Sequence, residues 1–337
     1  MSKKRQRREK ARQKYMKDAF KTEKEVSKPE KAIKEREGIL GKLQSVYEKD
    51  YKKLMILTFL MLILGFVQIG YQTATTGDFV SKGVSLKGGV TVTITDPSMD
   101  APELEEFLES SFPDKDIIVR TLAGLGDSRS LTVEADITDN NEVSRLESVI
   151  VEQLGLSSED YSISFVGSSL GSNFFRQTII AVIVAFIAMA IVVFAYFRVP
   201  IPSIAVIISA LSDIVVTIAV INMLGIKIST GGIAALLMLI GYSVDTDILL
   251  TTRLFKRKEG TLQQSIYSSA KTGLTMTITS IAAVTVAIML SQSEALRQIM
   301  VILLIGLIID IPNTWIQNTG ILRWYIERRS EKEDEQA

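Results

Sequence analysis

The chain of 337 residues is 47% hydrophobic, and its 38 basic and 38 acidic side chains leave a formal net charge of zero. The sequence contains no cysteine, which excludes disulfides and thiol chemistry, and no histidine, which removes the usual transition-metal ligand. Histidine is also the side chain that most readily titrates near neutral pH, so proton-linked chemistry here must use carboxylates, beside Lys or Arg where a cation is needed.

Residues 1–53 form a charged tail in which basic side chains crowd the first 12 positions. Such a composition buries little apolar surface, so we expect this tail to be disordered or a solvated helix on the cytoplasmic side. The basic run suits weak contact with ribosomal RNA or anionic lipid headgroups. It also suits simple retention of the tail on the cytoplasmic side of a membrane, which is the interpretation we favour.

The first apolar run covers residues 54–72 and is long enough to cross a bilayer, which takes about 20 helical residues. A cleaved signal peptide has a short basic leader and a shorter apolar core. Here the leader exceeds 50 residues and the apolar run has full length, so we predict a membrane anchor.

Residues 78–170 form a polar block with alternating strand and helix patterns. Asn140 or Asn141 is suited to cap a helix whose inward side carries Val143, Leu146, Val149 and Ile150. The order βαββαβ predicts an α+β ferredoxin-like domain. The expected strands are 90–95, 116–122, 130–136 and 161–166, the expected helices are 101–111 and 140–153, and a turn is expected at 124–127.

Residues 174–322 return to the membrane, and residues 323–337 form a second charged tail. Together with the first run, the chain has six predicted transmembrane helices, the later ones at 177–197, 201–222, 232–252, 272–291 and 298–318. Lys and Arg concentrate in the tails and loops of one side, which predicts that both termini are cytoplasmic. The predicted ferredoxin-like domain is therefore extracytoplasmic, and the chain is a multi-pass protein of the cytoplasmic membrane.

The fourth predicted span carries two carboxylates, Asp245 and Asp247. A charge at this depth costs at least about 2.5–3.5 kcal/mol, so it must face a bundle interior, a partner or water. Two positions along a helix correspond to a rotation of roughly 200°, so the two side chains cannot share a face. We expect Asp245 to face the interior and Asp247 to make a second contact or line a cavity. The alternative is that both merely cap or pair with neighbouring helices.

Two more ionisable residues lie in the predicted spans, Asp213 and Asp310, and Lys271 lies at the start of the fifth span. Lys271 opens the fifth span, where it can reach the cytoplasmic surface or pair with a carboxylate, and Asp245 is the expected partner. Pro312 and Asn313 predict a kink whose freed carbonyl needs a partner. The fifth span is also rich in Thr and Ser, which suits either a hydrated path or interhelical packing.

Several segments resemble the SecD/SecF family of protein-export membrane proteins, in its archaeal form, within the resistance-nodulation-division superfamily. Residues 241–253, which include Gly241, Tyr242 and Ser243, resemble the fourth-helix motif of the smaller subunit. The glycine pair Gly88 and Gly89 resembles the motif after the first helix. Further similar segments are 166–171 and 210–213, and the resemblance extends from residue 54 to about 325.

The resemblance implies an auxiliary subunit of the Sec translocase that pairs with SecD beside the SecY channel complex. It would assist the export of polypeptide, with proton flow as the suggested energy source. The expected partners are SecD, SecY, the exported polypeptide and membrane lipid. The sequence has no P-loop, and we expect no enzyme activity, catalytic residue, metal or cofactor. The alternatives are a small-molecule exporter subunit of the same superfamily and a passive scaffold of the channel.

Overall fold

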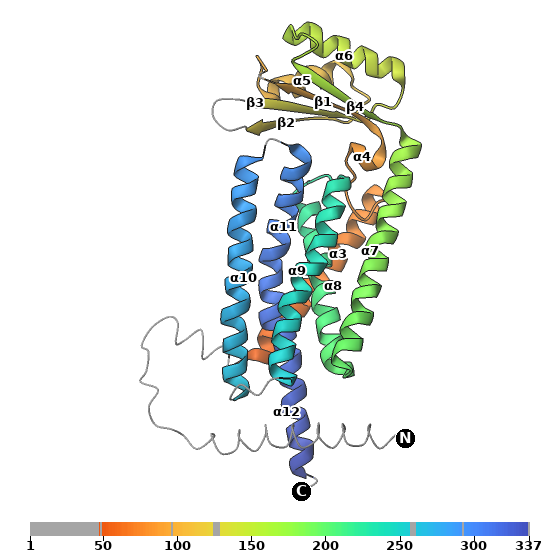
Figure 1. Ribbon diagram of the computed structural model, residues 1–337. Coiled ribbons are helices and arrows are strands. Elements are labelled where there is room, and N and C mark those ends of the chain that lie inside the picture. Colours follow the sequence, from red (N-terminus) through yellow and green to blue (C-terminus); the bar gives the residue numbers. More distant parts are fainter. Residues whose placement is uncertain are drawn as a thin grey trace.

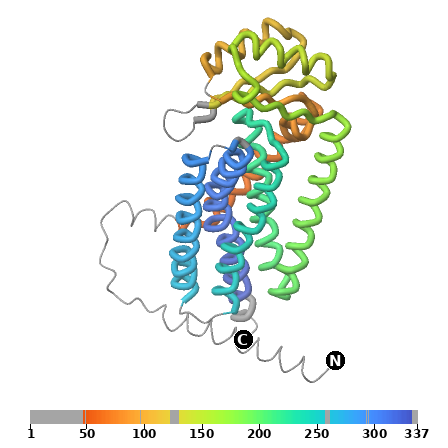
Figure 2. The backbone as a smooth tube through the Cα atoms, turned by 45° about the horizontal axis from the view of Figure 1, so that its top comes forward, coloured from red at the N-terminus to blue at the C-terminus, as the bar shows by residue number. Residues whose placement is uncertain are grey.

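The computed structural model describes residues 47, 49–95, 97–123, 129–256, 261–291 and 293–335. Six helices in this part of the chain are long and apolar enough to cross a membrane, which confirms the predicted number. They stand side by side as one bundle with a small α+β unit at one end (Figures 1 and 2). The predictions for the tail 1–46 and the turn 124–127 fall outside the described residues. The helices are α3 (Tyr51–Thr76), α7 (Ser168–Phe197), α8 (Pro200–Met223), α9 (Thr230–Phe255), α10 (Leu262–Leu290) and a last one that begins as α11 (Glu294–Pro312).

The six helices differ sharply in how much of their surface the rest of the protein covers. In the most apolar part of α8, 72% of residues are buried, whereas the corresponding share in α7 is 6%. Helices α3 and α10 resemble α7 in this respect, while α9 resembles α8. Because lipid is as apolar as a protein interior, a helix can be hydrophobic all round in either position. Helices α8 and α9 therefore form the centre of the bundle.

The last helix changes its winding instead of breaking at Pro312. After α11 the chain forms a π-helical turn, η1 (Asn313–Asn318), and continues as α12 (Thr319–Glu335). The predicted kink is thus replaced by a wider turn, which is a common feature of functional sites. The wider turn directs four polar side chains into the protein, where they are all completely buried: Asn313, Thr314, Gln317 and Asn318.

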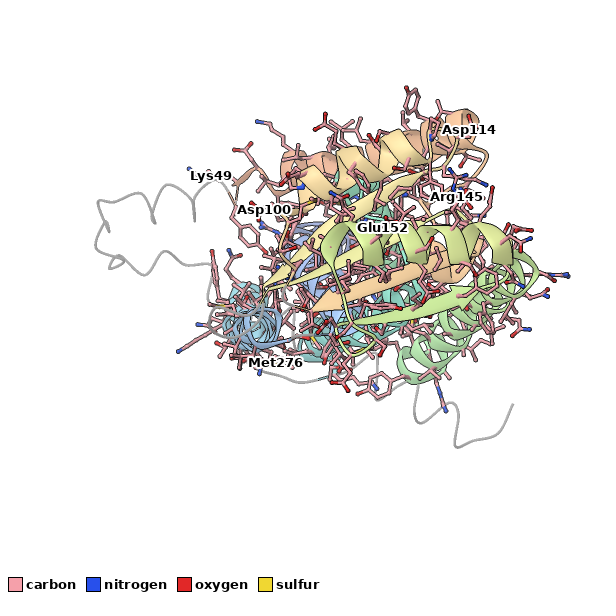
Figure 3. All side chains as sticks on the ribbon, turned by 90° about the horizontal axis from the view of Figure 1, so that it is seen from above. Lys49, Asp100, Asp114, Arg145, Glu152 and Met276 are labelled. Carbon is pink, nitrogen blue, oxygen red and sulfur yellow. The ribbon has the colours of Figure 1, made fainter. Side chains whose placement is uncertain are left out.

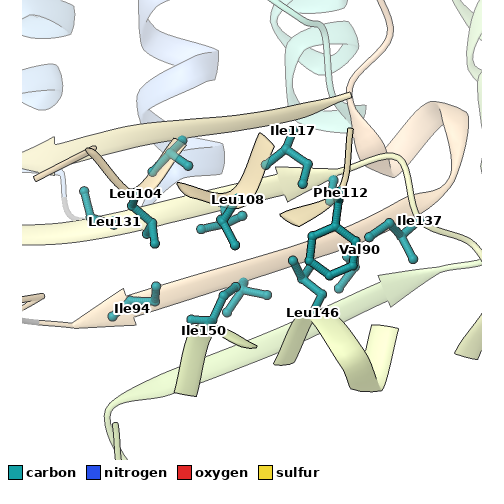
Figure 4. Close-up of a cluster of buried hydrophobic side chains, with 14 of the residues drawn as sticks. Val90, Ile94, Leu104, Leu108, Phe112, Ile117, Leu131, Ile137, Leu146 and Ile150 are labelled. Atoms are coloured by element: carbon teal, nitrogen blue, oxygen red, sulfur yellow. The ribbon is translucent and has the colours of Figure 1, made fainter. Parts of the chain in front are cut away.

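The α+β unit consists of two helices packed on one face of a four-stranded antiparallel sheet with the order β2-β3-β1-β4. Inward side chains of the strands, such as Val90 and Leu131, meet Leu108 and Leu146 of the helices in one apolar core (Figure 4). Seen from above, charged residues such as Arg145 and Glu152 lie on the outer side of this unit (Figure 3). The elements are β1 (Gly89–Thr95), α5 (Ala101–Ser111), β2 (Ile117–Ala123), β3 (Arg129–Ala135), α6 (Asn140–Leu154) and β4 (Tyr161–Val166).

These bounds agree with the predicted ones to one residue at each end. The predicted helix cap was wrong: the side chain of Asp139 accepts hydrogen bonds from the N–H groups of Asn141 and Glu142. The carboxylate of Asp139 accepts hydrogen bonds from two of the free N–H groups at the start of α6, whereas Asn140 and Asn141 already belong to that helix.

A short helix that the sequence patterns did not predict, α4 (Val84–Lys87), joins the α+β unit to the start of α7. Gly88 follows α4 with a positive φ of 98°, a backbone conformation that favours glycine. A Cβ atom at Gly171 of α7 would lie 2.7 Å from the Gly88 nitrogen, so the absence of a side chain lets the two segments come close. Two ion pairs add to this junction: Lys87 with Asp136, and Lys227 with Asp116 at 2.8 Å. Two backbone hydrogen bonds also connect the segment before α4 to Ile228, at 2.7 and 2.8 Å. The α+β unit is therefore held against the bundle at several points.

We expect Gly171→Ala to destabilise this junction. Alanine is the better helix former, so any loss must come from the clash with Gly88, and overpacking of this kind costs about 1–3 kcal/mol. The measurement is the midpoint of thermal unfolding in detergent, together with protease cleavage between the α+β unit and the bundle. Gly70→Ala is the matched control, because a Cβ atom there would meet nothing within 4 Å. Equal midpoints for the two variants would contradict the prediction.

Candidate functional site

Three carboxylates from three helices lie deep in the bundle. Asp213 comes from α8, Asp247 from α9 and Asp310 from α11, and each is at most 1% exposed. The sequence predicted all three as polar residues of the membrane interior. Their side chains are linked to one another through hydrogen bonds from neutral groups, and we call them the carboxylate cluster.

Asp213 is held by two neighbouring elements. The hydroxyl of Ser243 on α9 donates to one carboxylate oxygen, and the side-chain amide of Asn313 in η1 donates to the other at 2.7 Å. These bonds connect α8 to α9 and to the π-helical turn. Removing either donor would leave a buried carboxylate oxygen without a partner, which is costly in a low-dielectric interior.

Asp247 and Asp310 share a donor. The amide of Asn318 donates to Asp247 at 2.7 Å, and the hydroxyl of Thr314 lies 3.0 Å from an oxygen of each carboxylate. A hydroxyl group has one hydrogen, so Thr314 can donate fully to only one of the two carboxylates at a time. The two carboxylates therefore compete for the same hydrogen bond.

The carboxylate cluster has no basic partner among the described residues. Every ion pair found in this part of the chain involves other carboxylates. Neutral amides and hydroxyls are the donors instead, and they cannot cancel a full charge. Burying several uncompensated charges is very unfavourable, so the number of negative charges that the cluster carries matters greatly for its energy.

The structure reverses the expected roles of Asp245 and Asp247. Asp247 is completely buried, whereas Asp245 is exposed on the outer side of α9. The inference that they face different sides was right, because two helical positions differ by roughly 200°. The assignment was wrong because it ignored the neighbours of Asp247: Ser243, Leu250 and Thr251 lie three or four positions from it and are also buried.

The expected contact between Asp245 and Lys271 is also wrong. Lys271 is exposed on α10, and within the described chain no ion pair joins it to Asp245. Arg253 connects these two helices instead, because its guanidinium group donates to Ser268 at 2.6 Å and to Thr272 at 3.1 Å. The sequence analysis contained Arg253 as the last residue of the motif 241–253 and assigned it no contact with the next helix.

The hydroxyl groups along α10 donate to carbonyls of their own helix. Thr275, Thr277 and Thr279 each donate to the carbonyl of the residue four positions earlier in the same helix. Such bonds satisfy the hydroxyls locally and leave the helix free to face lipid or pack. The polar residues of η1 that the sequence analysis missed are Thr314, Gln317 and Asn318, and Gln317 donates to Ser212 at 2.9 Å. Their close spacing after Asp310 and Pro312 was the available signal.

The motif residues named in the sequence analysis lie in two places. Gly241 and Tyr242 are exposed on the same side of α9 as Asp245, whereas Ser243 is buried and bonds to Asp213. Gly88 and Gly89 lie at the junction between α4 and β1, where both have positive φ. A Cβ atom at Gly89 would lie 2.5 Å from the carbonyl oxygen of Ala135. One motif therefore serves the carboxylate cluster and the other serves the junction.

Comparisons with known proteins point to one family. Residues 147–328 match the family described as protein export membrane protein SecD/SecF, C-terminal. The chain is 38% identical to the protein-export membrane protein SecF of Pyrococcus furiosus, and the match covers 87% of this chain and 97% of that protein. It is also 38% identical to the SecF of Methanocaldococcus jannaschii, with 84% of this chain and 99% of that protein covered.

A solved structure of SecDF, a translocon-associated membrane protein from Thermus thermophilus, has a similar fold. The TM-score is 0.65 at 18% sequence identity, and the similarity covers 85% of this chain. The chain corresponds to 42% of that longer protein. At this identity the likeness concerns the fold alone.

We expect Thr314→Val to destabilise the bundle. The substitution keeps the shape of the side chain but removes the hydroxyl shared by Asp247 and Asp310, and an unsatisfied buried group costs about 1–3 kcal/mol. The midpoint of thermal unfolding in detergent should fall. Thr285→Val on α10 is the control, because its exposed hydroxyl donates only to its own helix, at the Ile281 carbonyl. A midpoint that falls no further for Thr314→Val than for the control would refute this role.

Proposed function

The chain belongs to the SecD/SecF family of protein-export membrane proteins, and on that premise we propose how it acts. It is an auxiliary subunit of the Sec protein translocase and assists the export of polypeptides across the cytoplasmic membrane together with SecD. The observation that carries this conclusion is the match to archaeal SecF proteins over nearly their whole length. The function involves no catalytic step of its own.

In this proposal the βαββαβ unit is a ferredoxin-like domain on the extracytoplasmic side, where the exported chain emerges. The sheet order β2-β3-β1-β4 supports a ferredoxin-like domain, because it is the order of a split βαβ arrangement. Lys and Arg are concentrated in both tails and in the loops at the end of the bundle away from this domain, which supports its extracytoplasmic position. The proposed domains are the tail 1–53, the first helix 54–72, the domain 78–170, the remaining bundle 174–322 and the tail 323–337.

We further propose that SecD covers the outer side of α9. Asp245, Gly241 and Tyr242 are exposed there, and a carboxylate facing lipid would cost at least about 2.5–3.5 kcal/mol. A partner that supplies a polar or basic group removes that cost. The structural match covers 42% of the SecDF chain, which fits half of such an assembly. The other proposed partners are the SecY channel, the exported polypeptide and the surrounding lipid. The N-terminal tail is suited to weak contact with the ribosome or with anionic lipid.

The carboxylate cluster is the proposed site of coupling to the proton gradient. Asp213 of α8 and Asp310 of α11 both accept hydrogen bonds from η1, from the adjacent residues Asn313 and Thr314. Gain or loss of a proton changes the net charge of a buried cluster that has no basic partner among the described residues, and this changes which hydrogen bonds are stable. A shift in these bonds would move the helices relative to one another.

The first test of the proposed function is depletion of the protein followed by pulse-chase labelling of secreted proteins. We expect export to slow several-fold, while tolerance to small toxic compounds stays unchanged. An exporter of small molecules would give the opposite pair of results. Unchanged export would exclude both the auxiliary role and a passive scaffold of the channel.

A second test distinguishes the role of the carboxylate cluster in coupling from the role of the exposed side of α9 in binding SecD. We expect Asp213→Asn to co-purify normally with SecD but to abolish the response of export to an imposed proton gradient, because it removes the titratable group. We expect Asp245→Asn to weaken co-purification several-fold while the pairs that do form keep the gradient response. A gradient response of wild-type size in Asp213→Asn would rule out the cluster as the coupling site.

A further inference from the structure

Tyr47 precedes α3 by four residues, yet its side chain reaches the π-helical turn near the other end of the sequence. Its hydroxyl donates to the backbone carbonyl of Trp315 at 2.7 Å, across 268 positions of the chain. The ring also lies 6.4 Å from the ring of Tyr267 on α10. Tyr47 belongs neither to the six spanning helices nor to the carboxylate cluster, so this bond links η1 to the segment that leads into α3.

The carbonyl that Tyr47 satisfies belongs to a turn with an altered hydrogen-bond ladder. A carbonyl in an α-helix accepts from the N–H four residues later, and a π-helical turn shifts this partner to the fifth residue. In η1 two successive carbonyls also accept from side-chain hydroxyls. The Thr314 carbonyl accepts from Thr319 at 3.1 Å, and the next carbonyl, that of Trp315, accepts from Tyr47. Side-chain donors therefore support the π-helical winding close to its junction with α12.

The start of α3 is fixed against α12. The Tyr51 hydroxyl donates to Glu327, and the guanidinium group of Arg323 lies 4.2 Å from the centre of the Tyr51 ring. Arg323 also pairs with Glu327 at 2.7 Å. A Cβ atom at Gly320 would lie 3.2 Å from Met55, so the two helices pack closely here. Because α12 continues directly from η1, these contacts keep the segment before α3 next to the π-helical turn.

The backbone that Tyr47 contacts also carries the donors of the carboxylate cluster. Thr314 comes directly before Trp315, and its hydroxyl lies 3.0 Å from an oxygen of Asp247. Asn318 follows within one turn and donates to the same carboxylate at 2.7 Å. A shift of the backbone at Trp315 therefore moves donors on both sides of it.

We propose that Tyr47 is a positioning residue for the carboxylate cluster and acts through the backbone of η1. Its hydroxyl holds the π-helical turn in the winding that directs Thr314 and Asn318 to Asp247. The consequence for export rests on the proposed coupling role of the cluster, whereas the link between Tyr47 and η1 can be measured without SecD or a gradient.

The first test measures local opening of η1 in the full chain in lipid nanodiscs. Tyr47→Phe removes the hydroxyl and keeps the ring. We expect hydrogen–deuterium exchange of residues 313–319 to become about fivefold faster, which corresponds to about 1 kcal/mol and is typical of one lost hydrogen bond. Exchange in α5 should stay as slow as in the wild type, which verifies that the variant is folded.

Trp315 supplies a spectroscopic signature of the same change. The chain has two tryptophans, so Trp324→Phe leaves Trp315 as the only one. The Trp315 side chain is 5% exposed and packs against Gly273 of α10. In the Trp324→Phe background, we expect Tyr47→Phe to shift the emission to longer wavelength.

Tyr51→Phe is the matched control, because it removes the same group from a tyrosine four positions away whose hydroxyl donates to α12 instead. It should leave exchange of residues 313–319 at the wild-type rate. Replacing Tyr47 by p-aminophenylalanine restores a hydrogen-bond donor at the end of the ring and should restore slow exchange. This rescue distinguishes the lost hydrogen bond from a general loss of packing.

The second test uses export driven by an imposed proton gradient. We expect Tyr47→Phe to co-purify with SecD normally and to show a gradient response several-fold smaller than that of the wild type. If the wild type shows no gradient response but the exchange result holds, the proposed coupling role fails and the positioning of η1 by Tyr47 stands.

Three results would overturn the proposal. One is equal exchange of residues 313–319 in Tyr47→Phe and the wild type. Another is equally fast exchange in Tyr51→Phe, which would mean that any loosening of this end of the bundle opens η1. The third is a gradient response of wild-type size in Tyr47→Phe.

Discussion

The structure depends on satisfying buried carboxylates inside a bundle that offers them no base among the described residues. The π-helical turn η1 makes this possible, because its wider winding brings the amides of Asn313 and Asn318 and the hydroxyl of Thr314 to the carboxylates of three helices. An ordinary helical turn would rotate some of these groups away. The packing of α8, α9 and the last helix is thus set by hydrogen bonds as well as by apolar contact.

Close packing supports this arrangement from the outside. A Cβ atom at Gly273 of α10 would lie 2.2 Å from the ring of Trp315, so only glycine lets α10 approach the π-helical turn at this point. Likewise, Gly306 of α11 faces Leu239 of α9, where a Cβ atom would lie 2.6 Å from that side chain. Close approach through small residues is the usual basis of helix association in membranes. The cluster therefore lies among helices that approach one another closely.

At the other end of the bundle, the glycine pair, α4 and the two ion pairs tie the α+β unit to α7 and to the α8–α9 loop. The α8–α9 loop leads directly into α9, which carries Ser243 and Asp247. Backbone hydrogen bonds between this loop and the segment before α4 continue the connection. The fold thus provides a continuous physical link between the carboxylate cluster and the domain proposed to meet the exported chain.

The sequence by itself determined the six apolar helices and the strands and helices of the polar block, because hydropathy and local periodicity are properties of short segments. It also identified Asp213, Asp247 and Asp310 as groups that must avoid lipid, since the cost of a charge in a membrane does not depend on the fold. Only the tertiary structure decided that Asp247 faces inward and Asp245 outward. The direction of a side chain around a helix that is apolar on all sides depends on its neighbours. The π-helical turn donates hydrogen bonds from Asn313 to Asp213 and from Asn318 to Asp247, and these carboxylates lie on helices far away in the sequence, so no local pattern contains that information.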